Sequence, residues 1–325
     1  MRILINIIKI FLAIIILYYL LYLFFVYKDV ILCNAGRNEL RGKIVYSLGG
    51  HSIKVIDLSS RKNTTIYSKY GLSEQIGFMD NPSFSPQGDA IVFSKSSNYL
   101  FDDKLYIMNS DGSNVKQFLD FNNLAAICPS WSPDGERIAF IVEATSYQGV
   151  YIIKLKDRTI TKISDINPDK SQPTWSTDGK KIAFASRQEQ RTYLKNNLYE
   201  VKYMGGVLIV DISSKDIIKY FDLGSEPSWS PEGALFAYGD KYGFHIIDLN
   251  EPLNSEYAFI PHAKIFFGIG KAFPIRWSPD GKYIVFCKEI WPGIAGIYVA
   301  PINNPNQQIR IGTDNQAIIG MSWAE

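Results

Sequence analysis

The amino-acid sequence predicts an all-β fold: a six-bladed β-propeller of four-stranded antiparallel blades, preceded by a single N-terminal transmembrane helix. One short phrase recurs five times between residues 82 and 281, and its aromatic residues are spaced 47, 44, 54 and 48 residues apart. A period of this size is typical of propeller blades. Before the repeats, residues 10–27 form 18 consecutive residues without a charge, close to the length that a helix needs to cross a bilayer. We therefore expect a membrane anchor with a short linker in residues 1–41 and the propeller in residues 42–325.

The apolar N-terminal run has two interpretations that the residues leave open. An uncleaved signal anchor is favoured, because secretory signal peptides usually have an apolar region of only about 7–15 residues. A cleaved signal peptide is the alternative, with Cys33-Asn34-Ala35 as a tolerable cleavage site. Basic residues stand on both sides of the run, so the positive-inside rule does not decide the orientation. Because single N-terminal anchors usually export the domain behind them, we expect the propeller on the periplasmic or extracellular side, or secreted after cleavage.

Each copy of the phrase describes one strand, a tight turn and the start of a second strand. The consensus is Pro-Ser-Trp-Ser-Pro-Asp-Gly. In such a turn, Pro presets φ at the second position and Gly accepts a positive φ at the last. The five copies are residues 82–88, 129–135, 173–179, 227–233 and 274–281, of which the last contains one extra residue.

Apolar runs after each turn supply the other strands of a blade. The second strand is expected at residues 91–93, 138–140, 182–184, 235–237 and 284–286. A third and a shorter fourth strand follow, for example at residues 105–108 and 116–119. Four antiparallel strands in each repeat make a propeller blade.

The two ends of the chain complete one more blade. Residues 319–324 have the pattern of a first strand, and Trp323 lies 46 residues after Trp277. Residues 42–47 have the pattern of the missing second strand, and residues 52–58 and 63–68 supply the third and fourth. Sharing one blade between the termini closes the ring and leaves no open sheet edge.

The repeat resembles the TolB-type propeller repeat, also called the WD40-like or PD40 repeat. The match rests on Pro-x-Trp-Ser-Pro-Asp-Gly-x-x-Ile-Ala-Phe and on the third-strand sequence Leu-Tyr-Ile-Met-Asn-Ser-Asp-Gly-Ser at residues 105–113. The resemblance covers nearly all of residues 42–325, and it implies a fold and an interaction style rather than a named activity. TolB carries an α/β domain before its propeller. Relatives of prolyl oligopeptidase and dipeptidyl peptidase have the same kind of blades and carry an α/β-hydrolase domain. We expect neither domain here.

The composition offers little material for catalysis. Lys plus Arg is 34 and Asp plus Glu is 32, a balance that does not predict nucleic-acid binding. Three histidines and three cysteines form no metal-ligand or nucleophile motif, so we expect no catalytic residue, no metal and no cofactor. We interpret the Asp of each turn as a turn residue, the repeated Trp residues as interblade packing, and Cys33, Cys128 and Cys287 as free thiols.

Candidate binding residues fall on the face formed by the loops between second and third strands and between blades. Loops on a rigid scaffold are where binding usually resides. Blade four also contains an insertion, residues 187–205, which is either a tolerated surface hairpin or a partner-binding arm. The candidates on this loop face are Tyr99, Phe101, Phe266, Phe267 and Trp291, together with Arg187, Arg191 and Lys195 of the insertion.

One residue departs from the pattern of the inner strands. The position before the repeated aromatic is Ser or Thr in five blades but Arg276 in the sixth. Glu226, just before Pro227, is a possible counter-charge in or near the central channel. We interpret the two residues as a structural ion pair, with a channel site as the alternative.

Two functions remain open. The first is a non-enzymatic, membrane-tethered and monomeric propeller that binds a protein or peptide partner in the cell envelope. The alternative is a propeller enzyme, a lyase or glycosidase acting on polysaccharide in the central funnel. The enzyme would need clustered carboxylates about 5–10 Å apart, so a pocket with two such groups would favour it.

Overall fold

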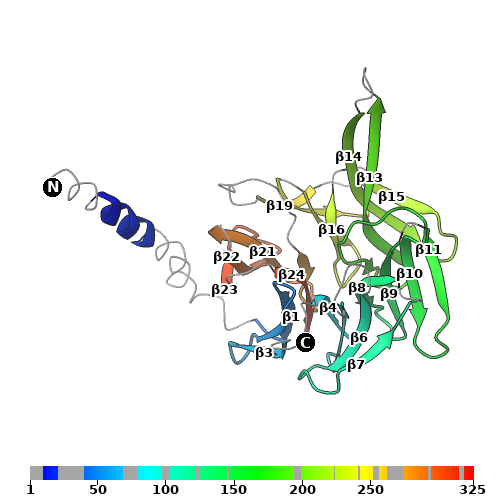
Figure 1. Ribbon diagram of the computed structural model, residues 1–325, viewed down its shortest axis with the longest axis horizontal. Coiled ribbons are helices and arrows are strands. Elements are labelled where there is room, and N and C mark those ends of the chain that lie inside the picture. Colours follow the sequence, from blue (N-terminus) through cyan, green and yellow to red (C-terminus); the bar gives the residue numbers. More distant parts are fainter. Residues whose placement is uncertain are drawn as a thin grey trace.

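The computed structural model describes most of the propeller and one N-terminal helix. The described residues are 10–20, 40–68, 79–96, 103–121, 124–144, 146–193, 199–222, 224–240, 242–251, 256–261, 274–291, 294–314 and 318–325. Its strands form six four-stranded antiparallel sheets (Figure 1). The predicted six-bladed propeller is confirmed.

The blades are named in chain order, starting from the one that contains both ends of the propeller. In order from the inner to the outer strand, blade 1 has β24 (Ile318–Ala324), β1 (Lys43–Leu48), β2 (Ser52–Asp57) and β3 (Lys62–Ser68); blade 2 has β4 (Met79–Phe84), β5 (Ala90–Lys95), β6 (Lys104–Asn109) and β7 (Lys116–Leu119); blade 3 has β8 (Ala125–Trp131), β9 (Arg137–Glu143), β10 (Gly149–Lys154) and β11 (Ile160–Ser164). Blade 4 has β12 (Thr174–Trp175), β13 (Lys181–Tyr193), β14 (Tyr199–Asp211) and β15 (Ile217–Asp222); blade 5 has β16 (Ser225–Trp229), β17 (Leu235–Gly239), β18 (Gly243–Asp248) and β19 (Glu256–Pro261); blade 6 has β20 (Ile275–Trp277), β21 (Tyr283–Trp291), β22 (Ile294–Pro301) and β23 (Ile309–Asp314).

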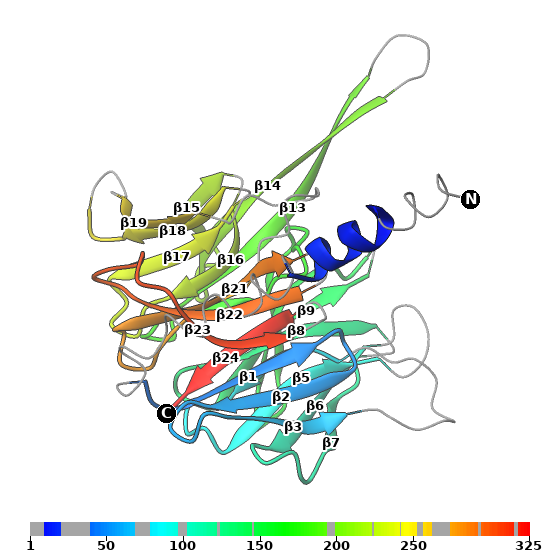
Figure 2. The ribbon, with the colours of Figure 1, turned by 90° about the vertical axis from the view of Figure 1, so that its left-hand side faces the viewer.

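Ring closure by the C-terminal strand is as the sequence predicts. β24 pairs antiparallel with β1, with Trp323 opposite Ile44, and Figure 2 shows the red strand beside the blue one. The Trp323 Nε1 group donates a hydrogen bond to the carbonyl oxygen of Arg41 at 3.1 Å. The last strand of the chain is thus held by the first.

The hydrophobic core consists of six clusters, and each cluster lies between two adjacent blades. All six blades place one large aromatic side chain of the second strand in this core, at most 1% exposed: Tyr46, Phe93, Phe140, Phe184, Phe236 and Phe286. Such a side chain contributes about 3–5 kcal/mol relative to Ala. Burial on both faces of every sheet explains why these strands are apolar at nearly every position.

In blade 5, the structure shifts the alignment of the second strand with the other repeats by one residue. The pattern aligns residues 235–237 with 182–184. In the structure, Trp229 pairs with Phe236 just as Trp175 pairs with Ile182. Phe236 therefore corresponds to Ile182, and the half-buried Tyr238 occupies the place of Phe184.

The repeated Asp residues serve the turns, as expected. In blade 4 the Ser176 hydroxyl donates to Asp178 Oδ1 at 2.6 Å, and the Lys180 amide donates to the same oxygen at 3.0 Å. These two hydrogen bonds favour the ionised carboxylate and hold the pKa of Asp178 below its usual value. The side chain is therefore committed to the turn and is charged at neutral pH.

The repeated Ser-Trp pair joins neighbouring inner strands. The Nε1 group of Trp175 donates to the Ser130 carbonyl at 3.1 Å, and Trp277 makes the same bond to Ser228 at 3.2 Å. The backbone amide of Phe84 donates to the Ser322 hydroxyl at 3.2 Å. Each of these bonds crosses from one blade to the next, which explains the recurrence of the phrase at these interfaces. Trp131 Nε1 and Trp229 Nε1 have no hydrogen-bond partner among the described residues.

The N-terminal segment is described only in part. Residues 10–20 are α-helical, and every large apolar side chain among them is at least 52% exposed. Among the described residues, no helix has both the length and the apolar character to cross a membrane. The rest of the expected span, residues 21–27, lies outside the described residues, as does Cys33.

The other two cysteines lie where the repeat count places them. Cys128 is on β8 of blade 3 and Cys287 is on β21 of blade 6. Both are buried and free, as expected.

Candidate functional site

Polar side chains from four inner strands and from the segment just before β12 meet near the propeller axis. We call Asn81, Cys128, Gln172, Glu226 and Arg276 the axial cluster. Arg276 Nη2 donates to Gln172 Oε1 at 2.8 Å, although the two residues are 104 positions apart. They belong to blades 6 and 4, which are not neighbours in the ring, so the contact crosses the centre of the propeller.

Arg276 and Glu226 form the ion pair that the sequence predicts. The distance from Arg276 Nη1 to Glu226 Oε2 is 3.6 Å, and the side chains are only 11% and 15% exposed. The same Nη1 group donates to the Ile275 carbonyl at 2.7 Å. At 3.6 Å the pair makes an electrostatic contact rather than a short hydrogen bond.

The other members of the axial cluster continue the network through blades 2, 3 and 4. Asn81 Nδ2 donates to Cys128 Sγ at 3.2 Å, and this thiol donates to the Lys170 carbonyl at 3.3 Å. Gln172 Nε2 donates to the Pro129 carbonyl. The side-chain contacts of the cluster therefore link five of the six blades across the axis.

Backbone kinks place three of these residues. Asn81, Cys128 and Glu226 have φ values of 52°, 54° and 52°, and each lies at a register shift between the inner strand and its neighbour. A bulge of this kind re-aims a side chain relative to the strand. At the matching point of β24, Gly320 has φ 67°, and a Cβ atom there would lie 2.5 Å from Asn81 Cα. Only glycine fits that position.

Burial dominates the electrostatics around the axial cluster. Desolvation raises the pKa of Glu226 to about 7, although the nearby Arg276 charge acts in the opposite direction. Desolvation also raises the pKa of Asp80, on β4, to about 6, and it raises the pKa of the Cys128 thiol well above its usual value. The thiol therefore stays protonated at neutral pH and is not an activated nucleophile.

Some polar atoms around the axis lack a hydrogen-bond partner among the described residues. They are Asp80 Oδ1, Ser171 Oγ and Glu226 Oε2. Buried polar atoms normally have partners. These three oxygen atoms can therefore accept hydrogen bonds from water or from a polar group of a ligand.

The structure tests none of the binding roles expected for the loop-face candidates. Tyr99, Phe101, Lys195, Phe266 and Phe267 lie outside the described residues. Arg187, Arg191 and Trp291 lie on β13 and β21, where their backbone positions alone are described. The proposed binding roles of all eight residues stay predictions.

Sequence reasoning found Arg276 and Glu226 but missed Asp80, Asn81 and Gln172. The sequence does contain a pattern that marks these positions. The residue before the first Pro of the phrase is Asn81, Cys128, Gln172 or Glu226, whereas the residues around it repeat. A variable polar position inside a regular repeat indicates a surface that packing does not determine.

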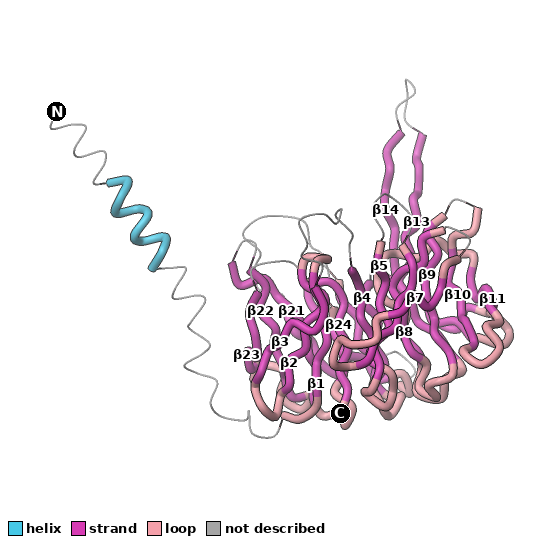
Figure 3. The backbone as a smooth tube through the Cα atoms, turned by 60° about the horizontal axis from the view of Figure 1, so that its bottom comes forward, coloured by secondary structure: helices cyan, strands magenta, loops and turns pink. Residues whose placement is uncertain are grey.

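The insertion of blade 4 forms a long two-stranded arm. Residues 187–193 of β13 pair in register with residues 199–205 of β14, from Arg187 opposite Gly205 to Tyr193 opposite Tyr199. β15 pairs with β14 only as far as Gly206. The arm extends past the rest of its blade (Figures 1 and 2). Figure 3 shows the arm on the side opposite most of the short turns.

Comparison with known proteins identifies the propeller type. The family model described as the TolB beta propeller domain matches residues 120–252. The Tol-Pal system protein TolB of Wigglesworthia glossinidia brevipalpis is 35% identical over 77 residues, which are 24% of this chain and 16% of that protein.

Solved structures agree on the fold. TolB from Acinetobacter baumannii has a TM-score of 0.65 at 15% identity, covering 87% of this chain and 66% of that chain. Oligogalacturonate lyase from Vibrio parahaemolyticus has a TM-score of 0.52 at 12% identity, covering 79% of this chain and 73% of that chain. The matches thus cover 16% and 66% of the length of these two TolB proteins, and the structural likenesses show the fold alone. The repeat match over residues 120–252 and the six-bladed architecture together are those of a TolB-type β-propeller of PD40 repeats, the type that the sequence resembles.

Proposed function

We propose that this protein is a non-enzymatic propeller that docks a protein or peptide partner in the cell envelope. Residues 10–27 would tether it to the membrane, and the loop face with the arm would hold the partner. The observation that carries the proposal is the arm itself, because among the described strands its two strands pair only with each other beyond Gly206. The likeness to TolB, a Tol-Pal system protein by name, supports a role in the envelope.

The backbone of the arm suits binding by strand addition. Among the described strands, only β14 pairs with β13 from residue 187 to 193, and none pairs with the outer edge of β14 from residue 199 to 205. An unpaired strand edge is a template for an extended segment of another chain. The sequence of the arm adds Arg187, Arg191 and three Tyr residues, the residue types that dominate binding hot spots.

The chain enters the propeller on the face opposite the arm. Leu40 and Arg41 precede β1 at the end where Lys43 pairs with Ala324, the last residue of β24, and the C-terminus lies among the short turns in Figure 3. With residues 10–27 in a membrane, the turns would face the tether and the arm would point away from it. A partner on the loop face would then be free of steric hindrance from the bilayer.

Shortening the arm is expected to weaken partner capture while leaving the fold stable. Replacing residues 187–205 by a short Gly-Ser link removes strands that pair only with each other and keeps the pairing of Gly206 with Asp222. Hot-spot residues contribute about 2 kcal/mol or more each, so we expect capture to fall at least about tenfold. The measurement is cross-linking and pull-down from detergent-solubilised membranes, with the melting temperature recorded for each variant.

Two further variants sharpen this test. Phe267→Ala and Trp291→Ala should also weaken capture, since both residues are expected on the loop face. The matched control is charge reversal on the turn face, for example Lys282→Glu, whose parent side chain is 75% exposed. If turn-face reversals abolished capture and the loop-face changes had no effect, the assignment of the binding face would be inverted.

Membrane tethering has its own test. We expect the full chain to fractionate with membranes and to resist carbonate extraction, because 18 uncharged residues can span the hydrocarbon core. A soluble mature protein beginning near Gly36 would contradict the anchor and support the cleaved signal peptide.

The enzyme hypothesis gains no support from the turn face. Two carboxylates, Asp178 and Glu232, do line one pocket there. A glycosidase needs one carboxylic acid whose pKa is raised so that it can donate a proton. The pKa of Asp178 is lowered instead by its bonds to the turn, so its side chain is a poor general acid.

A further inference from the structure

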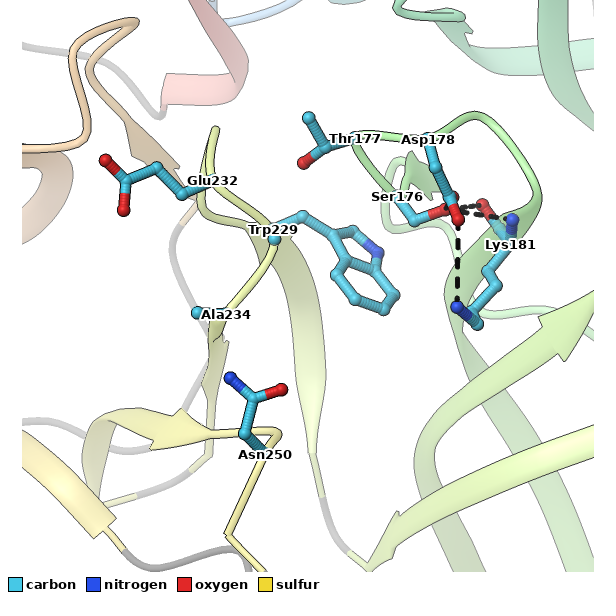
Figure 4. Close-up of a pocket in the computed structure, with 9 residues that line it drawn as sticks. Ser176, Thr177, Asp178, Lys181, Trp229, Glu232, Ala234 and Asn250 are labelled. Carbon is cyan, nitrogen blue, oxygen red and sulfur yellow. Dashed lines mark hydrogen bonds and ion pairs between the residues drawn. The ribbon is translucent and has the colours of Figure 1, made fainter.

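A pocket opens between blades 4 and 5 on the turn face (Figure 4). Its volume is about 270 Å³, which is below the range of about 300–1,000 Å³ for drug-sized ligands and suits a single side chain. The lining residues that matter here are Asp178 and Lys181 from blade 4, and Trp229, Glu232 and Asn250 from blade 5. The Trp229 indole forms one wall.

The equivalent position at the interface between blades 3 and 4 is filled by a side chain. We call such a position, beside the inner-strand Trp and the turn Asp, a seat. There the guanidinium of Arg137 stacks on the Trp175 ring, with Cζ 4.6 Å from the ring centroid. Its Nη2 group donates to Asp134 Oδ2 at 2.6 Å and to the Gly179 carbonyl at 3.1 Å. The side chain fills the seat, and Trp175 is only 6% exposed.

All three partners of that guanidinium have counterparts in the pocket. The repeat places Asp178 at the position of Asp134, Trp229 at that of Trp175, and Gly233 at that of Gly179. These three counterparts all line the pocket. The binding groups for a guanidinium are therefore present a second time.

The guanidinium itself is missing from this second seat. The position of Arg137 is taken by Lys181, whose Nζ lies 4.0 Å from Asp178 Oδ2. In the described part of the chain, neither Lys181 nor any other cation stacks on Trp229, which is half-buried. Lysine has a shorter reach and lacks the planar fork of arginine. Glu232 adds a second carboxylate at the pocket wall.

We propose that the pocket between blades 4 and 5 binds the guanidinium group of an arginine side chain on a partner protein or peptide. The group would stack on Trp229, pair with Asp178 and donate to the Gly233 carbonyl, as Arg137 does in the adjacent seat. Cation–π contact with Trp and the several fixed N–H donors of a guanidinium both favour arginine over lysine. This site is separate from the loop face and does not depend on the arm.

The test uses the full chain in mild detergent, labelled with 5-fluorotryptophan. The sequence has six Trp residues, and Trp229→Phe assigns the relevant ¹⁹F signal. The probes are N-acetylarginine amide, agmatine and N-acetyllysine amide. We expect the arginine amide to shift the Trp229 signal saturably, and the lysine amide to bind at least about fivefold more weakly. If the arginine amide binds more tightly than agmatine, the result supports an arginine within a protein or peptide as the ligand. If agmatine binds more tightly, the ligand is a small guanidine and the assignment to a protein or peptide is wrong.

Two reciprocal substitutions make the test specific. Lys181→Arg should fill the seat from within, raise the melting temperature and weaken binding of the arginine amide at least about fivefold. Arg137→Lys should open the equivalent seat, so that the Trp175 signal also responds to the probe. The remaining Trp signals report whether each variant keeps its fold.

The proposal is overturned by any of three results. The first is no response of the Trp229 signal to either guanidinium probe in the folded protein. The second is an equal response to the lysine amide. The third is unchanged affinity in a folded Lys181→Arg variant. Failure here would leave the loop-face proposal intact, because pull-down with the shortened arm measures a different face.

Discussion

Deletion of residues 319–325 is expected to abolish cooperative folding of the whole propeller. The deletion removes nearly all of β24, leaves the β1 edge unpaired and takes out Met321, which is fully buried. It also removes Trp323 and its bond to the Arg41 carbonyl. Loss of the buried Met321 side chain alone costs about 2–5 kcal/mol, and unpaired buried backbone groups add further cost. Domains hold only about 5–15 kcal/mol in total, so little stability should remain.

Thermal unfolding followed by circular dichroism measures this effect. Removal of Glu325 alone is the matched control, because that side chain is exposed and lies after the strand. We expect the control to melt with the parent protein. A truncated chain that also melted at the parent temperature would show that closure by β24 contributes little.

Substitution of Arg276 by Met is expected to be the most destabilising single change near the axis. Removing one partner of a buried ion pair leaves an uncompensated charge, which costs about 3–5 kcal/mol. Here the charge left behind is Glu226, at 3.6 Å from Arg276 and 15% exposed. The substitution also removes the hydrogen bond to Gln172, and with it the contact between blades 4 and 6.

The size of this effect should depend on pH. Burial raises the pKa of Glu226 from 4.5 to about 7, so the folded state binds this proton more tightly than the unfolded chain does. The resulting stabilisation is full below the unfolded pKa and is lost as the pH rises through the folded pKa. Without Arg276 the folded pKa rises further, and the loss continues to higher pH. The difference in free energy of unfolding between parent and Arg276→Met should therefore be larger at about pH 8 than at about pH 5.

Denaturant unfolding at the two pH values provides the measurement. Lys282→Met is the matched control, because Lys282 and Asp280 form an exposed pair with a distance of 3.7 Å, and such pairs contribute less than about 1 kcal/mol. The double substitution Arg276→Met with Glu226→Gln should recover part of the lost stability. An effect of Arg276→Met that is equal at both pH values would show that Glu226 is not the group left behind.

Local patterns predicted most of the fold because propeller blades are periodic along the chain. The turn sequence specifies its own hydrogen bonds, as Ser176, Asp178 and Lys180 show, and near-continuous apolar runs mark strands that neighbours cover on both faces. The error in blade 5 has the same origin. Residues 234–238 are apolar or aromatic at every position, so hydrophobicity alone does not distinguish Phe236 from Tyr238 as the counterpart of Phe184.

The sequence by itself determined the number of blades, the turns, the closure of the ring and the two charges of the axial pair. The tertiary structure alone decided the links from Arg276 to Gln172 and from Asn81 to Cys128, because these contacts join blades whose side chains share no local pattern. It also decided which interblade seat is open. Arg137 and Lys181 hold the same place in the repeat, but only a folded interface shows that the longer, planar cation covers its neighbour's Trp and that the shorter one leaves Trp229 open.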